Sequence, residues 1–346
     1  MFKTIILQAI TLAAAALGGY IAHLLHVPLA WMIGALAATA AMNWVRPAVV
    51  HPAIRPAALM LLGFGFAQTF DAPVLAAVAG AVPALVLAAV GSIFCGILVV
   101  PIMQRMAGLD SRTGYFSTVP GGVIVMVVLA QREGVAVAPV TMAQTIRVIT
   151  VVLTIPIGIT LLGEHGSDTA FQAVRPAIDA LGLAMLLPAG LAVSLLLRRT
   201  GLANPWMMGC FALGLGLMVS GHMPSGIPGW MIDMAQVGMG AGLGARLTPD
   251  FLRRSQRLAV ASVVSTLALS VLCLGLAVLL AWGWGLPVTA AMLGLAPGGM
   301  PEMGVTAKLL ELAVPLVMGF HLTRTLLCNF LVGPIYRGAR AVRLLR

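Results

Sequence analysis

Apolar segments long enough to cross a lipid bilayer recur throughout this chain. A transmembrane helix needs about 20 consecutive apolar residues. Such stretches lie at 5–25, 29–45, 74–103, 137–162, 177–197, 202–220, 258–282 and 313–336, with shorter candidates at 56–70 and 229–246. A mean hydropathy of +1.05 and a charged fraction of only 9% do not suit a water-soluble domain of this size. The chain is therefore expected to be an all-α, polytopic membrane protein.

Two further apolar segments, at about 113–131 and 288–307, are each interrupted by Pro-Gly-Gly. The interruptions consist of Pro120, Gly121, Gly122 and of Pro297, Gly298, Gly299. Proline lacks a backbone donor, and glycine lets the chain leave the helical conformation. Irregular backbone at membrane depth is tolerated only where protein or a water-filled cavity satisfies its polar groups. The pattern predicts two broken, re-entrant segments in addition to about ten transmembrane helices.

The chain also matches itself in four blocks that occur in the same order. "VPLAWMIGAL" (27–36) pairs with "LANPWMMGCF" (202–211), and "LGFGFA" (62–67) pairs with "VGMGAG" (237–242), both at an offset of 175. At an offset of 177, "TVPGGVIVMVVLA" (118–130) pairs with "LAPGGMPEMGVTA" (295–307), and "MAQTIRVI" (142–149) pairs with "GFHLTRTL" (319–326). This order predicts a duplication. The first membrane repeat covers 1–165 and the second covers 174–346, with a polar boundary near 163–175.

The positions of the basic residues bear on the orientation of the repeats, because cytoplasmic loops collect Lys and Arg. If each Pro-Gly-Gly segment enters and leaves on one side, each repeat has five spans and the second repeat is inverted. With both termini in the cytoplasm, all but four of the 20 basic residues are then cytoplasmic. The exceptions are Arg175 and Lys308 outside, and Arg147 and Arg324 within helices. The alternative, in which both segments cross fully, gives two parallel repeats of six crossings and stays open.

Arg147 and Arg324 occupy equivalent positions inside apolar helices. A charge at the bilayer centre is costly and normally faces the interior of the bundle with a partner. Glu302 is the only acid placed to serve internally. One acid against two bases predicts a positive site suited to an anion, such as a carboxylate held by an Arg fork. The alternative is that each Arg caps carbonyls freed by the neighbouring break.

His321 precedes Arg324 by three residues and shares its helix face, while Gln144 is its counterpart in the first repeat. His321 could carry a coupling proton together with Glu302, or it could be a hydrogen-bonded structural residue. Ser117, Thr118 and Thr306 could add neutral hydrogen bonds. The predicted substrate-binding residues are Pro120, Gly121, Gly122, Gln144, Arg147, Pro297, Gly298, Gly299, Glu302, His321 and Arg324. Coupling to H⁺ or Na⁺ stays open.

The composition argues against several other functions. The net charge of +10 is spread over short loops, which is typical of a topology signal rather than of a nucleic-acid surface. The four cysteines have neither CxxC spacing nor a His partner, so neither a disulfide framework nor a metal site is expected. The six histidines do not form the converging set that copper or iron chemistry requires. We therefore expect no enzyme activity, no cofactor and no nucleic-acid partner.

The sequence resembles the AbrB family of bacterial inner-membrane proteins at four blocks. These are "VPLAWMIGAL", "FSTVPGGVIVMVVLAQREG", "MAQTIRVITVVLTIP" and "LAPGGMPEMGVTAKLLELAVPLVMGFHLTRTLL". The resemblance covers nearly the whole chain in two copies. Members of the family are often labelled as an ammonia monooxygenase or as a regulator of gene expression, and the resemblance supplies no substrate. The paired glycine motifs also look like those of sodium-coupled citrate and glutamate symporters, which is an analogy of architecture alone.

The sequence therefore predicts a multi-pass protein of the bacterial inner membrane that works as a secondary transporter. Interrupted helices at equivalent places in two inverted repeats are typical of such carriers. The expected partners are the lipid bilayer and a small anionic solute of the carboxylate type, and homo-oligomerisation stays open. The alternative is a membrane sensor or regulatory protein that binds a ligand without moving it and affects gene expression indirectly.

Overall fold

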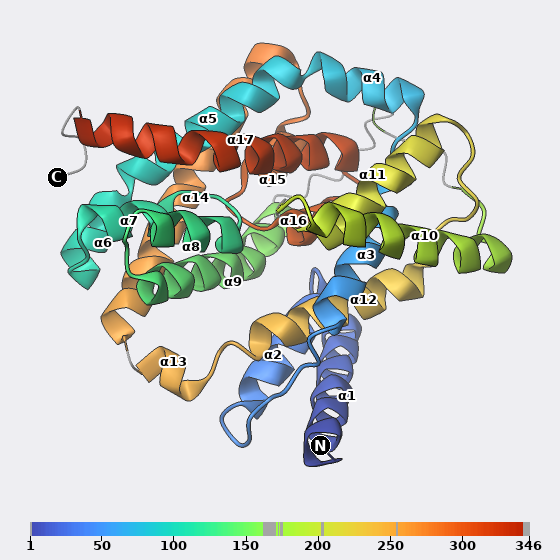
Figure 1. Ribbon diagram of the computed structural model, residues 1–346, viewed down its shortest axis with the longest axis horizontal. Coiled ribbons are helices and arrows are strands. Elements are labelled where there is room, and N and C mark those ends of the chain that lie inside the picture. Colours follow the sequence, from blue (N-terminus) through green and yellow to red (C-terminus); the bar gives the residue numbers. More distant parts are fainter. Residues whose placement is uncertain are drawn as a thin grey trace. The chain divides into compact units, whose positions relative to one another are not determined.

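The computed structural model describes residues 2–161, 171, 173, 176–201, 204–253 and 255–341. Across these ranges the regular structure is entirely helical, so the expected all-α class is confirmed (Figure 1). Most of the helices are joined by short turns. The helices are apolar, and several are long enough to cross a bilayer, so the protein is membrane-embedded.

The described residues of the first half form nine helices. They are α1 (Phe2–Leu24), α2 (Ala30–Met42), α3 (Ile54–Ala67), α4 (Ala72–Gly80), α5 (Val82–Leu98), α6 (Val100–Ala107), α7 (Ser111–Thr118), α8 (Val123–Arg132) and α9 (Val137–Leu161). The described residues of the second half form α10 (Ala180–Arg198), α11 (Pro205–Val219), α12 (Gly229–Gly244), α13 (Pro249–Arg253), α14 (Gln256–Trp284), α15 (Val288–Leu295), α16 (Met300–Leu309) and α17 (Val314–Ala341).

Corresponding helices of the two halves begin at the same offsets as the matching sequence blocks. Helices α2 and α3 begin at 30 and 54, and α11 and α12 begin 175 residues later, at 205 and 229. Helices α7, α8 and α9 begin at 111, 123 and 137, and α15, α16 and α17 begin 177 residues later, at 288, 300 and 314. The predicted repeat boundary at 163–175 lies almost wholly outside the described residues. Arg175, which the topology places outside the membrane, and the cytoplasmic Arg254, Arg343 and Arg346 of that prediction also lie outside the described residues.

Five stretches of the described residues, one of them α5 and α6 taken together, are long and apolar enough to span a membrane. Up to seven spans result if two bent pairs each count as one. Helices α2 and α11 are apolar but shorter. The expected number of ten spans stays a prediction. One expected segment, 74–103, is divided in the structure among α4, α5 and the start of α6 (Ala72–Gly80, Val82–Leu98 and Val100–Ala107). Pro83 lies in the first turn of α5, where a residue without a backbone donor starts a helix readily.

The helices form two compact units, each drawn from both halves of the sequence. The first unit contains Met1–Ala77 and Thr169–Arg254, and the second contains Val78–Asp168 and Ser255–Arg346. The predicted repeats, 1–165 and 174–346, therefore divide the sequence, whereas each compact unit combines a segment of one repeat with the corresponding segment of the other.

Glycines allow the helices of the first unit to pack closely. A Cβ added at Gly63 of α3 would lie 2.6 Å from the Met207 carbonyl of α11. A Cβ at Gly240 of α12 would collide with the Met32 carbonyl of α2. Small residues at such contacts are the usual means of bringing two membrane helices together. The glycine motifs of α3 and α12 thus act in helix packing.

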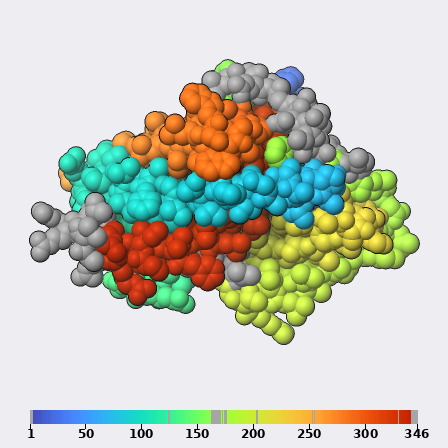
Figure 2. All heavy atoms as spheres, turned by 90° about the horizontal axis from the view of Figure 1, so that it is seen from above, coloured from blue at the N-terminus to red at the C-terminus, as the bar shows by residue number. Residues whose placement is uncertain are grey.

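The second unit is built around long helices that support the two interrupted segments. Helix α5 packs against α17 and α14, and Figure 2 shows it as the cyan band between the red α17 and the orange α14. Helix α9 contacts α7, α8 and α14, and α17 contacts α15 and α16. The hydroxyl of Tyr115 on α7 donates to the Val332 carbonyl of α17 over 2.8 Å. All predicted substrate-binding residues fall within this unit.

Candidate functional site

Both Pro-Gly-Gly segments interrupt their helices, as expected. Helix α7 ends at Thr118 and α8 begins at Val123, so residues 119–122 are not helical. Helix α15 ends at Leu295 and α16 begins at Met300, which leaves residues 296–299 outside the helices. The last carbonyls of a helix have no partner within that helix, and a buried carbonyl without a donor is costly. Each break therefore needs donors from elsewhere.

Helix α9 supplies the donors for the first break. The Gln144 amide nitrogen Nε2 donates to the carbonyl of Phe116 over 2.8 Å and to that of Val119 over 3.2 Å. The Arg147 guanidinium donates from Nη1 to the Val119 carbonyl over 3.0 Å and from Nη2 to the Gly121 carbonyl over 2.8 Å. Two side chains one turn apart on α9 thus cap the end of α7 and the interruption that follows it.

Helix α17 repeats this arrangement at the second break. His321 bonds through Nε2 to the Leu293 carbonyl over 3.1 Å. Arg324 donates from Nη1 to the Ala296 carbonyl and from Nη2 to the Gly298 carbonyl, both over 2.8 Å. Each donor and each of these acceptors lies 177 residues after its counterpart in the first half. The two breaks therefore share one hydrogen-bonding plan.

Each break also touches the long helix of the other half. The Cys328 thiol on α17 donates to the Pro120 carbonyl over 3.3 Å. A Cβ added at Gly298 would lie 2.9 Å from the Val151 side chain of α9. Both breaks therefore lie between α9 and α17. Sequence reasoning missed Val151 and Cys328, although each follows its Arg by four residues, on the same helix face, and the repeat offset pairs them.

The breaks place two short helices with their N-termini in this region. Gly122 and Gly299 are the N-cap residues of α8 and α16, and neither has a side chain that could cap. Glu302 lies in the first turn of α16 and is only 4% exposed, and its carboxylate contacts the space where a Cβ of Gly299 would be. A carboxylate is favoured at the positive end of a helix dipole. In the first half, Val125 takes the equivalent position.

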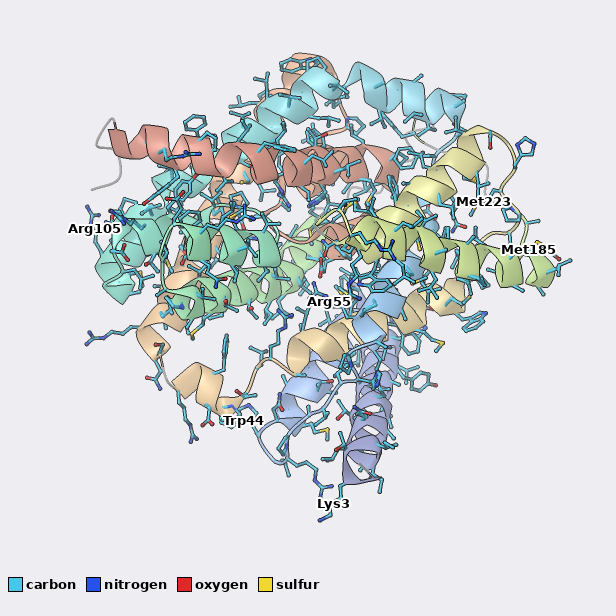
Figure 3. The ribbon with its side chains drawn as sticks, in the orientation of Figure 1. Lys3, Trp44, Arg55, Arg105, Met185 and Met223 are labelled. Atoms are coloured by element: carbon cyan, nitrogen blue, oxygen red, sulfur yellow. The ribbon has the colours of Figure 1, made fainter. Side chains whose placement is uncertain are left out.

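Arg147 and Arg324 are only 4% and 7% exposed. The loop cations behave differently: Lys3, Arg55 and Arg105, labelled in Figure 3, are exposed. The sequence left two roles open for Arg147 and Arg324, an anion site and carbonyl capping. In the structure each Arg caps carbonyls at its break. The structure also places one buried cation, Arg324, on the break that leads into α16, the helix that carries Glu302.

The polar residues at the second break are tied together more tightly than those at the first. Besides its bond to the Leu293 carbonyl, His321 accepts at Nδ1 from Arg324 Nη2 over 2.8 Å. These two contacts fix a neutral ring with its proton on Nε2. Protonation at Nδ1 would break the bond to Arg324 and put two cations together. The geometry therefore favours the structural role of His321 over the proton-carrying role.

Several atoms at the first break have no hydrogen-bond partner. They are the Ser117 hydroxyl, Gln144 Oε1 and Arg147 Nε, all in residues no more than 4% exposed. The two threonines that sequence analysis grouped with Ser117 bond to backbone carbonyls: Thr118 to Gly96 and Thr306 to Glu302. Within the described ranges, three or more His, Cys, Asp or Glu side chains do not gather into a group that could hold a metal ion.

The comparisons with known proteins agree on one family. A family model described as "Transition state regulatory protein AbrB" matches residues 31–340. The chain is similar to "Uncharacterized protein YhjN" of Bacillus subtilis (strain 168), with 27% identity over 94% of this chain and 91% of that protein. It is also similar to "Putative regulator AbrB" of Escherichia coli (strain K12), with 26% identity over 80% of each chain.

Proposed function

This chain belongs to the AbrB family, and we propose that it is a secondary transporter of a small, carboxylate-type anion across the bacterial inner membrane. The observation that carries the proposal is the matched pair of helix breaks, each bound by a buried Arg. Interrupted helices with exposed amides and carbonyls are the common substrate-binding device of secondary transporters. The proposal includes opposite orientation of the two repeats and cytoplasmic termini, which the distribution of basic residues in the sequence supports.

The charge of the two arginines supports an anionic ligand. Capping carbonyls does not require a cation, since Gln144 performs the same task at Phe116 and Val119 with a neutral amide. Burying a guanidinium in a membrane costs several kcal/mol. A buried charge in a membrane protein usually acts on a ligand or pairs with another group, which offsets this cost. Two arginines against one Glu302 leave the region positive.

Transport requires that the site open in turn to the two sides of the membrane. The polar side chains of the site are closed off from solvent in this structure, with Gln144 and His321 at most 1% exposed. The glycines of the breaks are partly exposed at positions 121, 122 and 299. The glycines of each break give the backbone freedom to move while α9 and α17 hold the carbonyls. A ligand that accepts hydrogen bonds from Arg147 or Arg324 would draw these donors away from the carbonyls. Binding and rearrangement of the breaks are thereby coupled.

The function is tested by flux into proteoliposomes that contain the purified protein. Counterflow of radiolabelled carboxylates, chosen by a thermal-shift screen, should exceed that of empty liposomes, and it should respond to an imposed proton or sodium gradient. Arg147→Gln and Arg324→Gln should each lower flux about 10- to 100-fold, as the loss of a buried charge-assisted hydrogen bond implies, while the protein still elutes as a folded species. Arg105→Gln, at an exposed position, is the matched control. Normal uptake by both interior variants would refute the site.

A second candidate function is a membrane-embedded regulator that binds a ligand without moving it. The name of the Escherichia coli relative, which describes it as a regulator, favours this candidate. The same purified protein distinguishes the two functions. Saturable binding of a carboxylate with no counterflow, under any imposed gradient, would support the regulator and count against the transporter.

A further inference from the structure

The two breaks have the same hydrogen-bonding pattern, but they differ in how many of their side-chain polar atoms have a hydrogen-bond partner. At the second break, His321 bonds on both sides of its ring, to the Leu293 carbonyl and to Arg324. At the first break, Gln144 donates with its amide nitrogen and leaves Oε1 without a partner. Its orientation is fixed, because three carbonyl acceptors surround the nitrogen and a carbonyl cannot donate to an amide oxygen.

The three unpartnered groups of the first break belong to one cluster. Gln144 Nε2 and Arg147 Nη1 both donate to the Val119 carbonyl, so these two side-chain ends lie within roughly 6 Å of each other, twice a hydrogen-bond length. Gln144 Nε2 also donates to the Ser117 carbonyl over 3.3 Å, so Ser117 belongs to the same helix end that Gln144 and Arg147 cap. In the second half, Ser117 is replaced by Gly294, which has no hydroxyl.

A buried polar atom without a partner costs about 1–3 kcal/mol, and three in one cluster indicate a ligand that pairs with them. Arg147 Nε can only donate and Gln144 Oε1 can only accept, while the Ser117 hydroxyl can do either. The complementary ligand must therefore present an acceptor and a donor close together. A carboxylate with a hydroxyl on the adjacent carbon has this arrangement.

We propose that the first break is a subsite for a small 2-hydroxycarboxylate. Its carboxylate accepts from Arg147 Nε and the Ser117 hydroxyl, and its hydroxyl donates to Gln144 Oε1. An ammonium group could also donate to Gln144, but it would add a third cation beside Arg147 and Arg324. The hydroxyl is therefore preferred over the amine of an amino acid. The inference rests on the proposed function in taking the ligand to be a carboxylate, and it assigns discrimination between carboxylates to the first break.

The test uses the full-length protein in nanodiscs and isothermal titration with matched pairs of acids. Glycolate is compared with acetate, lactate with propionate, and malate with succinate, so that each pair differs only in the hydroxyl. In at least one pair, the hydroxy acid should bind about 5- to 100-fold more tightly than the acid that lacks the hydroxyl. The acid without the hydroxyl has no donor for Gln144 Oε1 and leaves that atom unpaired. Equal affinity within every pair, or no binding of any of these acids, would overturn the proposal.

Gln144→His is the informative variant, since it installs the residue of the second break. A His at 144 can donate to the Phe116 carbonyl and accept from Arg147, so the break stays capped while the free acceptor is removed. The preference for the hydroxy acid should fall to within about twofold. Arg105→Gln, at an exposed position, should retain the wild-type preference. Retention of the preference in Gln144→His, or its loss in Arg105→Gln, would overturn the assignment.

Ser117→Ala separates the carboxylate contact from the hydroxyl contact. This variant should weaken the binding of both acids of a pair by a similar factor and leave the ratio of their affinities unchanged. If that ratio fell to one, Ser117 would contact the ligand hydroxyl instead, and the assignment of Ser117 to the carboxylate would be overturned. Binding and flux fail independently in these experiments. Hydroxy-acid preference without counterflow would uphold the subsite and refute transport, and counterflow of carboxylates without that preference would do the reverse.

Discussion

The two compact units bury polar groups in different ways. In the first unit, a neutral amide caps the carbonyls at the C-terminal end of α12. Asn43 Nδ2 donates to the Gly244 carbonyl over 3.1 Å and to the Ala245 carbonyl over 3.2 Å. In the second unit, the same task is shared between side chains of α9 and α17 that include two guanidinium groups. A neutral side chain is the less costly solution. The difference supports the proposal that the arginines of the second unit act on a ligand as well as on the backbone.

The strongest test of this contrast replaces a charged capping side chain in the second unit by a neutral one. Arg324→Gln gives the second break the neutral capping that Asn43 provides in the first unit. We expect carboxylate counterflow to fall about 10- to 100-fold, as the loss of a buried charge-assisted hydrogen bond implies. Asn43→Leu should lower the midpoint of thermal unfolding while counterflow per folded molecule stays within about twofold. If both variants affected flux alike, the functional difference between the units would not exist.

Glycine packing in the first unit provides the next largest effect, on stability alone. Gly34 of α2 faces the Gly18 carbonyl of α1 so closely that an added Cβ would collide with it. Gly34→Ala should reduce the free energy of unfolding by about 1–3 kcal/mol, the usual cost of overpacking. Gly216→Ala, where a Cβ would meet no neighbouring atom within 4 Å, is the matched control. Equal unfolding midpoints for the two variants would contradict the packing described for α1 and α2.

Proton coupling can be examined through the two ionisable residues that accompany the arginines. His321 is held neutral between a carbonyl and Arg324, so His321→Gln should leave the shape of the pH profile of uptake unchanged. Glu302→Gln should flatten that profile and reduce uptake about 10-fold, because it removes the one buried carboxylate at the α16 N-terminus. A pH profile that changed with His321 and not with Glu302 would reverse these roles.

The sequence predicted the helical class, the two interruptions and the family, and the comparisons and structure confirm these. Apolar length sets helix positions, and Pro-Gly-Gly forces a break whatever surrounds it. The sequence could not predict that Val151 and Cys328 contact the opposite break, because such contacts depend on how helices from distant segments pack. It also left two roles open for Arg147 and for His321. The side-chain directions show that Arg147 caps carbonyls and favour the structural role of His321, and spacing along a helix does not determine such directions.

The smallest expected effect concerns how the first break is anchored within the second unit. The Tyr115 hydroxyl is buried and donates to the Val332 carbonyl of α17, and its ring lies 5.2 Å from those of Phe116 and Tyr336. Tyr115→Phe retains the ring packing and removes one hydrogen bond, so the free energy of unfolding should fall by about 1 kcal/mol. Tyr20→Phe, at an exposed position on α1, should have no measurable effect. Thermal unfolding of both variants in one detergent measures the difference. Equal midpoints would mean that ring packing alone holds α7 against α17. The bond from Tyr115 to the Val332 carbonyl would then contribute nothing to anchoring the first break.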